Sequence, residues 1–273
     1  MKKYKIIPIF VPHSGCPHCC SFCNQRHITG QHSETTPAAA QSVIEKYLST
    51  IDSEKNHVEV AFYGGSFTAI DINKQNALLD VALQYKKQGK IHGIRLSTRP
   101  DCITVEILEN LKARGVTEIE LGVQSMRDVI LKKNNRGHTA EHVINSVALI
   151  KKYDFEIGLQ MMVGLIGDSK EDVIYTTHEI TRLKPDFVRI YPTLVFKNTK
   201  LHELYLKGEY TPLTVEQAVE ICASALKIFN DNNIKVIRLG LLLDGEDAKN
   251  NYVAGPYYPR FSEVVRSRVF NVS

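Results

Sequence analysis

Several features that mark other classes of protein are missing from this sequence of 273 residues. No stretch approaches the roughly 18 consecutive apolar residues of a membrane-spanning helix. The first apolar run is short, and no small-residue cleavage site of the kind that ends a signal peptide follows it. The chain has 34 Lys and Arg residues and 30 Asp and Glu residues, and both kinds are spread along its length. The sequence therefore has no concentrated basic segment of the kind that indicates a nucleic-acid surface. We expect a cytoplasmic protein with no membrane partner, and the charge alone does not establish RNA binding.

No low-complexity linker or internal repeat divides the chain either. With 43% hydrophobic residues, a chain of this length buries a large core, and α/β barrels of this size are commonly one domain. We predict a single domain over residues 1–273, with a barrel core at about 4–195 and a C-terminal extension at about 196–273. The sequence does not indicate an oligomeric state.

Apolar runs rich in β-branched residues alternate with segments of helical periodicity, which is the pattern of repeated βα units around a parallel sheet. Six strands are predicted, at Tyr4–Phe10, Val58–Tyr63, Gly93–Ser97, Glu118–Val123, Glu156–Met161 and Phe187–Tyr191. Helices are predicted between them, at Thr36–Leu48, Lys74–Gln88, Thr104–Ala113, Ala140–Tyr153 and Lys170–Leu183. The extension adds helices at Leu201–Leu206 and Val215–Asn230 and an apolar stretch at Ile234–Leu243. The predicted fold is therefore a partial (β/α)6 barrel of the TIM type, with a C-terminal helix and strand extension closing its side.

The unusual short motifs all follow predicted strands or lie at their ends. In strand order they are the cysteine-rich segment, Gly64-Gly65-Ser66, the segment beginning at Ser97, Gln124-Ser125, Gln160 and Tyr191-Pro192. Parallel barrels place their active sites at the C-terminal ends of the strands. We therefore expect these residues to gather at one edge of the sheet.

The cysteine-rich segment HSGCPHCCSFCN, residues 13–24, holds four of the six cysteines. In the cytosol such a cluster indicates metal binding or catalysis rather than disulfides. A structural zinc site normally joins two cysteine pairs that lie a dozen or more residues apart. A ferredoxin run needs a cysteine at position 22, which is Phe22. The third interpretation takes Cys16, Cys20 and Cys23 as three ligands of a four-iron cluster with one open iron, and leaves Cys19 outside. The isolated Cys102 and Cys222 are predicted to be buried structural thiols.

The C-x3-C-x2-C spacing, with an aromatic residue at Phe22, resembles the signature of the radical S-adenosylmethionine superfamily. Further stretches resemble the radical domain of the catalytic subunit of Elongator and its bacterial relatives: YGGSFTAI (63–70), STRPD (97–101), ELGVQS (120–125), NRGH (135–138), QMMVGL (160–165), RIYPTLVFKNTKLHELYLKGEY (189–210) and AGPYYPRFSEVVRSR (254–268). Two departures stand out. The Elongator subunit continues into an acetyltransferase-like domain, for which 273 residues leave no room, and it carries an N-terminal RNA-binding extension, whereas here the first predicted strand begins at Tyr4.

The resemblance implies a role for each motif. Cys16, Cys20 and Cys23 would hold a 4Fe–4S cluster, and S-adenosylmethionine would bind its open iron. Gly64, Gly65 and Ser66 would form the turn that meets the methionyl amine, and Arg136 would pair with the methionyl carboxylate. Ser97 and Gln124 match nucleoside contacts, and Gln160 matches an aspartate of the related oxygen-independent coproporphyrinogen oxidase. The alternatives are a tight βα turn, a surface arginine and polar strand ends. Cys19, His13, His18 and His27 are expected beside the cluster and not on it.

The resemblance also implies a reaction. A one-electron reductant of the flavodoxin or ferredoxin type would drive cleavage of S-adenosylmethionine to a 5′-deoxyadenosyl radical, which abstracts a hydrogen atom. Two classes of substrate stay open. In the first, the enzyme modifies a tRNA base, which Tyr257 and Tyr258 would stack near Arg260, Arg266 and Arg268. Tyr191 and Lys197 are further candidates for the substrate side of the barrel, and the alternative for the tyrosines is a place in the core. In the second, the chain is a cluster-bearing binding or delivery protein, or a small-metabolite radical enzyme, that has lost RNA handling.

Overall fold

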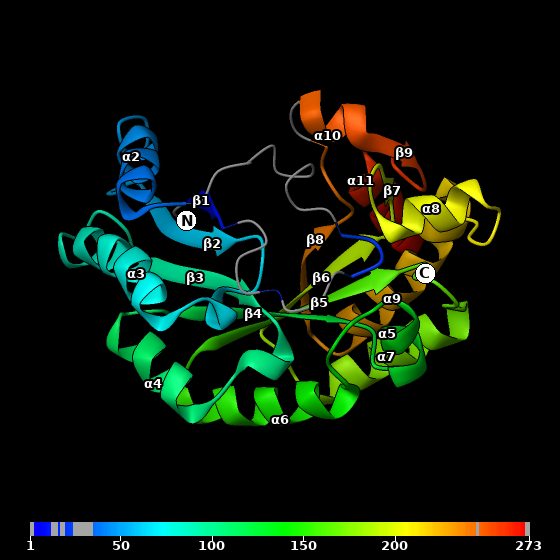
Figure 1. Ribbon diagram of the computed structural model, residues 1–273, viewed down its shortest axis with the longest axis horizontal. Helices are drawn as coiled ribbons and strands as arrows, with labels where there is room; N and C mark the ends of the chain where they lie inside the picture. Colours follow the sequence, from blue (N-terminus) through cyan, green and yellow to red (C-terminus); the bar gives the residue numbers. More distant parts are fainter. Residues whose placement is uncertain (1–2, 12–15, 17–19, 24–34, 244–245, 271–273) are drawn as a thin grey trace.

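The main sheet has seven strands, all parallel, in the order β1-β2-β3-β4-β5-β6-β8. The computed structural model describes residues 3–11, 16, 20–23, 35–243 and 246–270. Its sheet strands are β1 (Lys3–Phe10), β2 (Asn56–Tyr63), β3 (Gly93–Thr98), β4 (Glu118–Gln124), β5 (Glu156–Val163), β6 (Phe187–Pro192) and β8 (Lys235–Leu239). Figure 1 shows that the sheet curves into an arc whose two ends are β1 and β8. The predicted α/β half-barrel is confirmed, and each of the six predicted strands is present.

Helices cover the outer, convex face of this arc (Figure 1). They are α2 (Pro37–Leu48), α3 (Ile72–Lys87), α4 (Val105–Ala113), α5 (Asp128–Lys133), α6 (Ala140–Ile150), α7 (Lys170–Arg182) and α9 (Val215–Asp231), with short 3-10 turns η1 (Phe67–Ala69), η2 (Pro100–Cys102) and η3 (Lys151–Tyr153). Helix α3 begins two residues before its predicted start because the Asp71 side chain accepts hydrogen bonds from the first-turn N–H groups. The predicted helix Ala140–Tyr153 ends at Ile150 and continues as η3.

The two faces of the sheet differ in chemistry. Side chains that point outward, such as Ile94, Leu96, Ile119 and Leu121, are fully buried against the helices and form one large core. Side chains of the alternate positions point to the concave face, because successive residues of a strand face opposite sides. On β2, β3, β4 and β6 these inward positions carry many of the charged and polar groups of the sheet.

The C-terminal extension joins the barrel through this core. Its elements beyond α9 and β8 are β7 (Val195–Phe196), α8 (Lys200–Leu206), α10 (Glu246–Asn251), β9 (Tyr252–Ala254) and α11 (Phe261–Phe270). Strand β8 pairs with β6 and adds a seventh strand to the predicted six. Phe229 of α9 and Val265 of α11 belong to the same core cluster as the sheet, and β7 and β9 form a small antiparallel pair beside it.

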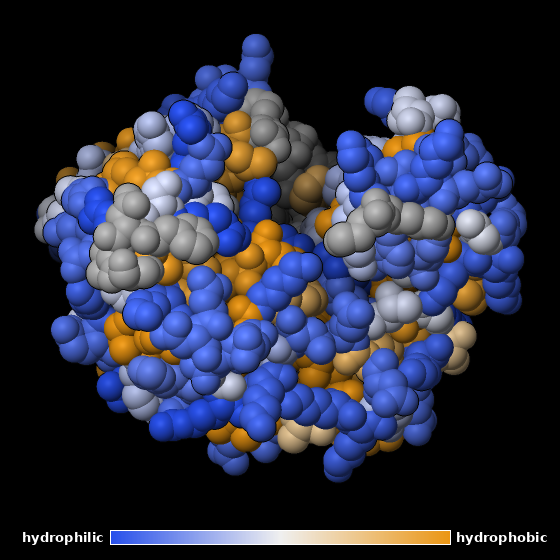
Figure 2. Space-filling model, turned by 180° about the vertical axis from the view of Figure 1, so that it is seen from behind, coloured by the Kyte–Doolittle hydropathy of each residue, from blue (hydrophilic) through white to orange (hydrophobic). Residues whose placement is uncertain are grey.

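The outer surface is mainly polar. Figure 2 shows one face, on which hydrophilic side chains predominate and which is hollowed at its upper edge, between the side that carries α2 and the side that carries α10. Within the described ranges, the helices are all too short or too polar to cross a lipid bilayer.

Candidate cofactor and substrate site

The predicted site residues lie at the C-terminal ends of neighbouring strands, as expected for a parallel barrel. Cys16, Cys20 and Cys23 follow β1, and Gly64 follows β2, which pairs with β1. Ser97 is the second-last residue of β3, Gln124 ends β4, and Gln160 lies in β5. The sheet therefore brings residues that are more than 140 positions apart in the sequence to one edge.

The described cysteines of the segment lie close together in a partly buried position. The Cys23 N–H donates to the Cys20 carbonyl at 3.1 Å, which forms a tight turn. Burial raises the pKa of the Cys16 thiol, the nearby Cys20 adds to this, and Arg99 and Arg136 oppose it. Among the described side chains, no three Cys, His, Asp or Glu residues already form a metal-binding group. Cys19, His13, His18 and His27 lie outside the described residues, so the predictions for them are not tested.

Asn134 anchors this cysteine segment. Its side chain is fully buried at the end of α5, and its Oδ1 accepts from the Ser21 hydroxyl at 2.9 Å and from the Ile166 N–H at 3.2 Å. Its Nδ2 donates to the carbonyls of Ile130 and Ile166. The Ser21 N–H donates to the Asn134 carbonyl, and the Ser21 carbonyl accepts from Leu201 N–H of α8. One amide thus joins the segment between Cys20 and Cys23 to two other loops.

Two arginines lie near the cysteines. Arg136 places Nη1 3.3 Å from the Cys20 Sγ and donates from Nη2 to the Gly122 carbonyl at 2.5 Å. The guanidinium packs closely on Gly122, where a Cβ would lie 3.3 Å from Arg136 Nη2. Arg99, which the sequence reasoning passed over within STRPD, is buried and pairs with Asp101 through two contacts of 3.0 and 2.7 Å.

Both guanidinium groups keep an unused donor. Arg136 Nε and Arg99 Nη1 are buried without a hydrogen-bond partner among the described atoms. A buried unpaired donor is costly, so such groups in native proteins usually await an ion, a water or a ligand. The Arg136 guanidinium contacts the Cys20 thiol, and the positive charges of both arginines oppose the rise in the pKa of Cys16. Positive charge at this position stabilises thiolates, which are the form of cysteine that binds iron.

The Gly-Gly turn after β2 has the backbone conformation that its sequence predicts. Gly64 and Gly65 have φ angles of 87° and 43°, a region that side chains with a Cβ rarely enter. Ser66 is fully buried, and its hydroxyl contacts Thr98 Oγ1 at 2.9 Å and accepts from the Arg99 N–H at 3.3 Å. The hydroxyl of Ser66 therefore joins the turn to the end of β3.

Gln124 and Gln160 are brought together. Gln160 Nε2 donates to Gln124 Oε1 at 3.3 Å, and Gln124 is buried while Gln160 is partly exposed. Gln124 has a φ of 67° at a shift in the β4–β5 register. Such a conformation costs a non-glycine residue about 1 to 3 kcal/mol, and it is concentrated at functional sites. Ser97 lies on the inner face two residues after Arg95 and is partly exposed.

The isolated cysteines differ from each other. Cys222 is fully buried in α9, as predicted. The prediction that Cys102 is buried is wrong, because this residue is partly exposed in η2. Burial nevertheless raises the pKa of its thiol, and its charge affects Cys16. The strand β3 ends two residues before η2 begins, so Cys102 lies at the site edge and not in the core.

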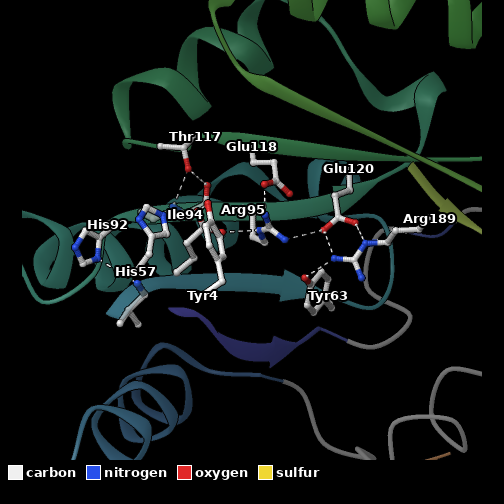
Figure 3. A network of polar contacts seen from close by, with 12 residues as sticks. Tyr4, His57, Tyr63, His92, Ile94, Arg95, Thr117, Glu118, Glu120 and Arg189 are labelled. Atoms are coloured by element: carbon white, nitrogen blue, oxygen red, sulfur yellow. Dashed lines mark hydrogen bonds and ion pairs between the residues drawn. The ribbon is translucent and has the colours of Figure 1, made fainter. Parts of the chain in front are cut away.

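Below the site, the inner face of the sheet carries a buried network of charged groups, which we call the polar floor. It consists of Glu59, Tyr63, Arg95, Glu118, Glu120 and Arg189. Arg95 Nε lies 2.9 Å from Glu59 Oε2, and the same guanidinium contacts Glu118 and Glu120. Arg189 Nε lies 2.5 Å from Glu120 Oε2 (Figure 3). None of these six side chains was predicted as a site residue from the sequence.

The polar floor holds more acid groups than bases. Its three carboxyl groups face two guanidinium groups. Burial raises the pKa of Glu118 to about 8; Arg95 lowers it, and the charges of Glu120 and Glu59 raise it further. At neutral pH the Glu118 carboxyl is therefore mainly protonated.

Comparison with known families identifies the class. The radical SAM superfamily model matches residues 10–180, and the radical SAM C-terminal domain model matches residues 185–270. The chain therefore belongs to the radical SAM superfamily. It is an enzyme of this class, whose cofactors are a 4Fe–4S cluster and S-adenosylmethionine.

The more particular resemblance is to Elongator-type proteins, as predicted. The chain is 33% identical over 202 residues to the tRNA uridine(34) acetyltransferase of Methanocaldococcus jannaschii, which covers 66% of this chain and 37% of that protein. It is 35% identical over 153 residues to Elongator complex protein 3 of Dictyostelium discoideum, which covers 54% of this chain and 27% of that protein. The solved structure of archaeal Elp3 from Methanocaldococcus infernus matches with a TM-score of 0.79 at 22% identity, over 100% of this chain and 64% of that one. The chain thus spans less than half of these two curated relatives.

The residues at the strand ends fit the cofactors of the family. Thiols of Cys16, Cys20 and Cys23 supply the soft ligands that iron–sulfur clusters need. The unpaired donors of Arg99 and Arg136 suit the negative charge of a thiolate-bound cluster and of a carboxylate. Their assignment as ligands and contacts stays a prediction.

Proposed function

We propose that this protein is a radical SAM enzyme that acts on a tRNA base, with uridine 34 as the base to test first. The observation that carries the proposal is the 33% identity with a protein named tRNA uridine(34) acetyltransferase across two thirds of this chain. That relative is much longer, so the proposal concerns the radical step and not acetyl transfer. The reductant is a small one-electron carrier of the flavodoxin or ferredoxin type.

In this proposal the chain's own residues divide the work. When bound, the cluster and S-adenosylmethionine supply a 5′-deoxyadenosyl radical that abstracts a hydrogen atom. Cys16, Cys20 and Cys23 hold the cluster, and the turn at Gly64-Gly65 and Arg136 orient the methionyl group. Ser97, Gln124 and Gln160 orient the nucleoside. The curved sheet and the polar floor close the space below, which keeps water from the reacting centre.

The predicted RNA surface is less basic than its sequence suggests. Arg260 pairs with Glu263, Arg268 pairs with Glu216, and Arg266 donates to the Val236 carbonyl. Tyr258 remains exposed near the ends of β6 and β8. A base stacked on tyrosine there is consistent with the proposal, whereas strong electrostatic attraction by these three arginines is not part of it.

The cysteines provide the first test. After anaerobic reconstitution, the protein should hold about four irons per chain, and Cys16→Ala, Cys20→Ala and Cys23→Ala should each lose the cluster. Cys19→Ala should keep it, and Cys222→Ala, a change at a buried thiol in α9, is the matched control. Loss of the cluster in Cys19→Ala would show that the three ligands are assigned in the wrong register.

The substrate is tested separately. The reduced protein should release 5′-deoxyadenosine slowly, and bulk tRNA should accelerate this release. Acceleration by a metabolite extract from which RNA has been removed, with none by tRNA, would reject the tRNA proposal in favour of a small-molecule substrate.

A further inference from the structure

We propose that Tyr63, Tyr191 and Arg189 form a binding site for the carbonyl oxygens of the substrate base. This inference rests on the proposed function, because it concerns the group that the radical site acts on. It assigns a task to side chains at the top of the polar floor.

The hydrogen bonds of these three residues leave two donors unused. Arg189 Nη2 donates to the Tyr63 hydroxyl at 3.1 Å, and its Nη1 donates to the Tyr191 hydroxyl at 3.4 Å. A guanidinium group has donors only, so each phenol oxygen acts as the acceptor in these bonds. Each phenol O–H must then donate to something else. In the described part of the chain, neither hydroxyl donates to an acceptor.

The arrangement is fixed from below. Glu120 contacts Arg189 through both carboxylate oxygens, at 2.5 and 3.0 Å, and it is itself buried in β4. Figure 3 shows Arg189 between Glu120 and Tyr63. Burial raises the pKa of Tyr63 to about 12, so this residue keeps its proton at neutral pH. The ion pair with Glu120 thus fixes the guanidinium group to which both phenol oxygens are bonded.

The position is that of a substrate next to the cofactor. Tyr63 ends β2 and directly precedes Gly64, while Tyr191 lies near the end of β6 on the other arm of the arc. Gln160 and Arg189 are partners in the register of β5 and β6. Both tyrosines are partly exposed, so a ligand that lies between the strand ends reaches them. Beneath them the floor is filled, since the Phe187 ring lies where a Cβ of residue 158 would be.

Two phenol donors beside a guanidinium select an uncharged group that carries acceptor oxygens. The rings of Tyr63 and Tyr191 add flat apolar surface, which suits a planar heterocycle. A base with two ring carbonyls, such as uracil, offers an acceptor to each donor. A base with an exocyclic amino group, such as cytosine, sets a donor against a donor and leaves buried polar groups unpaired.

The experiment compares a tRNA stem–loop that carries uridine 34 with two matched RNAs, one with cytidine and one with a pyrimidine that lacks the O4 carbonyl. The reduced enzyme should bind the uridine RNA about tenfold more tightly than either of the others. Tyr63→Phe and Tyr191→Phe, which remove only a hydroxyl, should each weaken binding of the uridine RNA about tenfold. One of the two tyrosines donates to O4. With the RNA that lacks O4, the variant of that tyrosine should bind as tightly as the wild type, because this hydrogen bond is absent in both.

Tyr47→Phe, a change on the outer helix α2 at a residue 38% exposed, is the control and should bind all three RNAs like the wild type. Equal binding of the three RNAs by the wild type would overturn the carbonyl site, and so would tyrosine variants that discriminate as well as the wild type does. The release of 5′-deoxyadenosine is read in the same samples. If the enzyme discriminated between the three RNAs but the RNAs did not stimulate release of 5′-deoxyadenosine, the proposed function would be rejected and the binding site would be supported.

Discussion

Glu118 is the residue at which protonation and folding are linked. Its pKa in the folded protein, about 8, is higher than the 4.5 of an exposed glutamate. Between these values the folded chain holds a proton that the unfolded chain has released. The contribution of Glu118 to the free energy of unfolding is therefore fully present below pH 4.5. This contribution is lost as the pH rises through about 8.

The Glu118→Gln variant should weaken this dependence. Glutamine is neutral at every pH, as the protonated carboxyl is, and its amide oxygen still accepts from Arg95. We expect the free energy of unfolding of the wild type to fall by roughly 3 to 4 kcal/mol more than that of the variant between pH 5 and pH 8. Urea titrations at several pH values measure this. Glu109→Gln, at an exposed site of α4, should keep the slope of the wild type. An unchanged slope in Glu118→Gln would mean that the carboxyl is ionised in the folded state.

The polar floor also explains what the sequence did not reveal at the scale of residues. Along β4, the letters EIELGVQ alternate between polar and apolar side chains. This alternation normally indicates a strand with one face in water. In a curved sheet whose outer face is covered by helices, the polar side chains point into the concave space and are buried there. The same alternation describes a strand face that is exposed to solvent and one that is buried with charged side chains. Glu59, Arg95 and Glu120 were therefore not predicted as site residues, whereas the cysteines were found from their spacing.

At the scale of elements, the strands were predictable and some helices were not. Strands such as Val58–Tyr63 are runs of β-branched and aromatic residues bounded by turn residues, and the structure extends them by a few positions at most. Helix α5 was missed because its six residues form fewer than two turns, too few for a helical period to be visible. It nevertheless matters, because it positions Asn134 and, through the turn that follows, Arg136.

Asn134 gives a prediction about the cysteine segment. Asn134→Ala removes four side-chain hydrogen bonds and leaves the Ser21 hydroxyl and the Ile166 backbone groups without these partners, while the Ile130 carbonyl still accepts from the backbone N–H of residue 134. We expect a loss of about 2 to 4 kcal/mol in the free energy of unfolding, and a faster release of iron from the reconstituted protein to a chelator. The measurements are a urea titration and the rate of iron release.

Asn110→Ala is the control for this element. Asn110 also makes side-chain hydrogen bonds, to Asn76 and Arg114, but it lies in α4, away from the cysteines. It should lower stability by less and leave iron release unchanged. If both variants released iron at the same rate, the role given to Asn134 in holding the segment would be wrong.

For the whole molecule, the shared core makes a prediction about domain organisation. Helix α9 packs between α7 and α11, and its buried face, including Leu226 and Phe229, belongs to the core of the barrel. A chain cut after residue 195 would expose this core and the edge of β6. We expect it to show no cooperative thermal transition, whereas the full chain unfolds in one step. A cooperative transition in the shortened chain would instead mean that the barrel and the extension are separate domains.

The unequal number of acids and bases in the polar floor also connects the ligand to the solvent. A neutral ligand leaves the proton on Glu118 in place. A cationic ligand makes the ionised form of Glu118 more favourable, so its binding would release that proton and strengthen as the pH rises. The number of protons released to the buffer when a ligand binds therefore indicates whether that ligand is neutral or cationic.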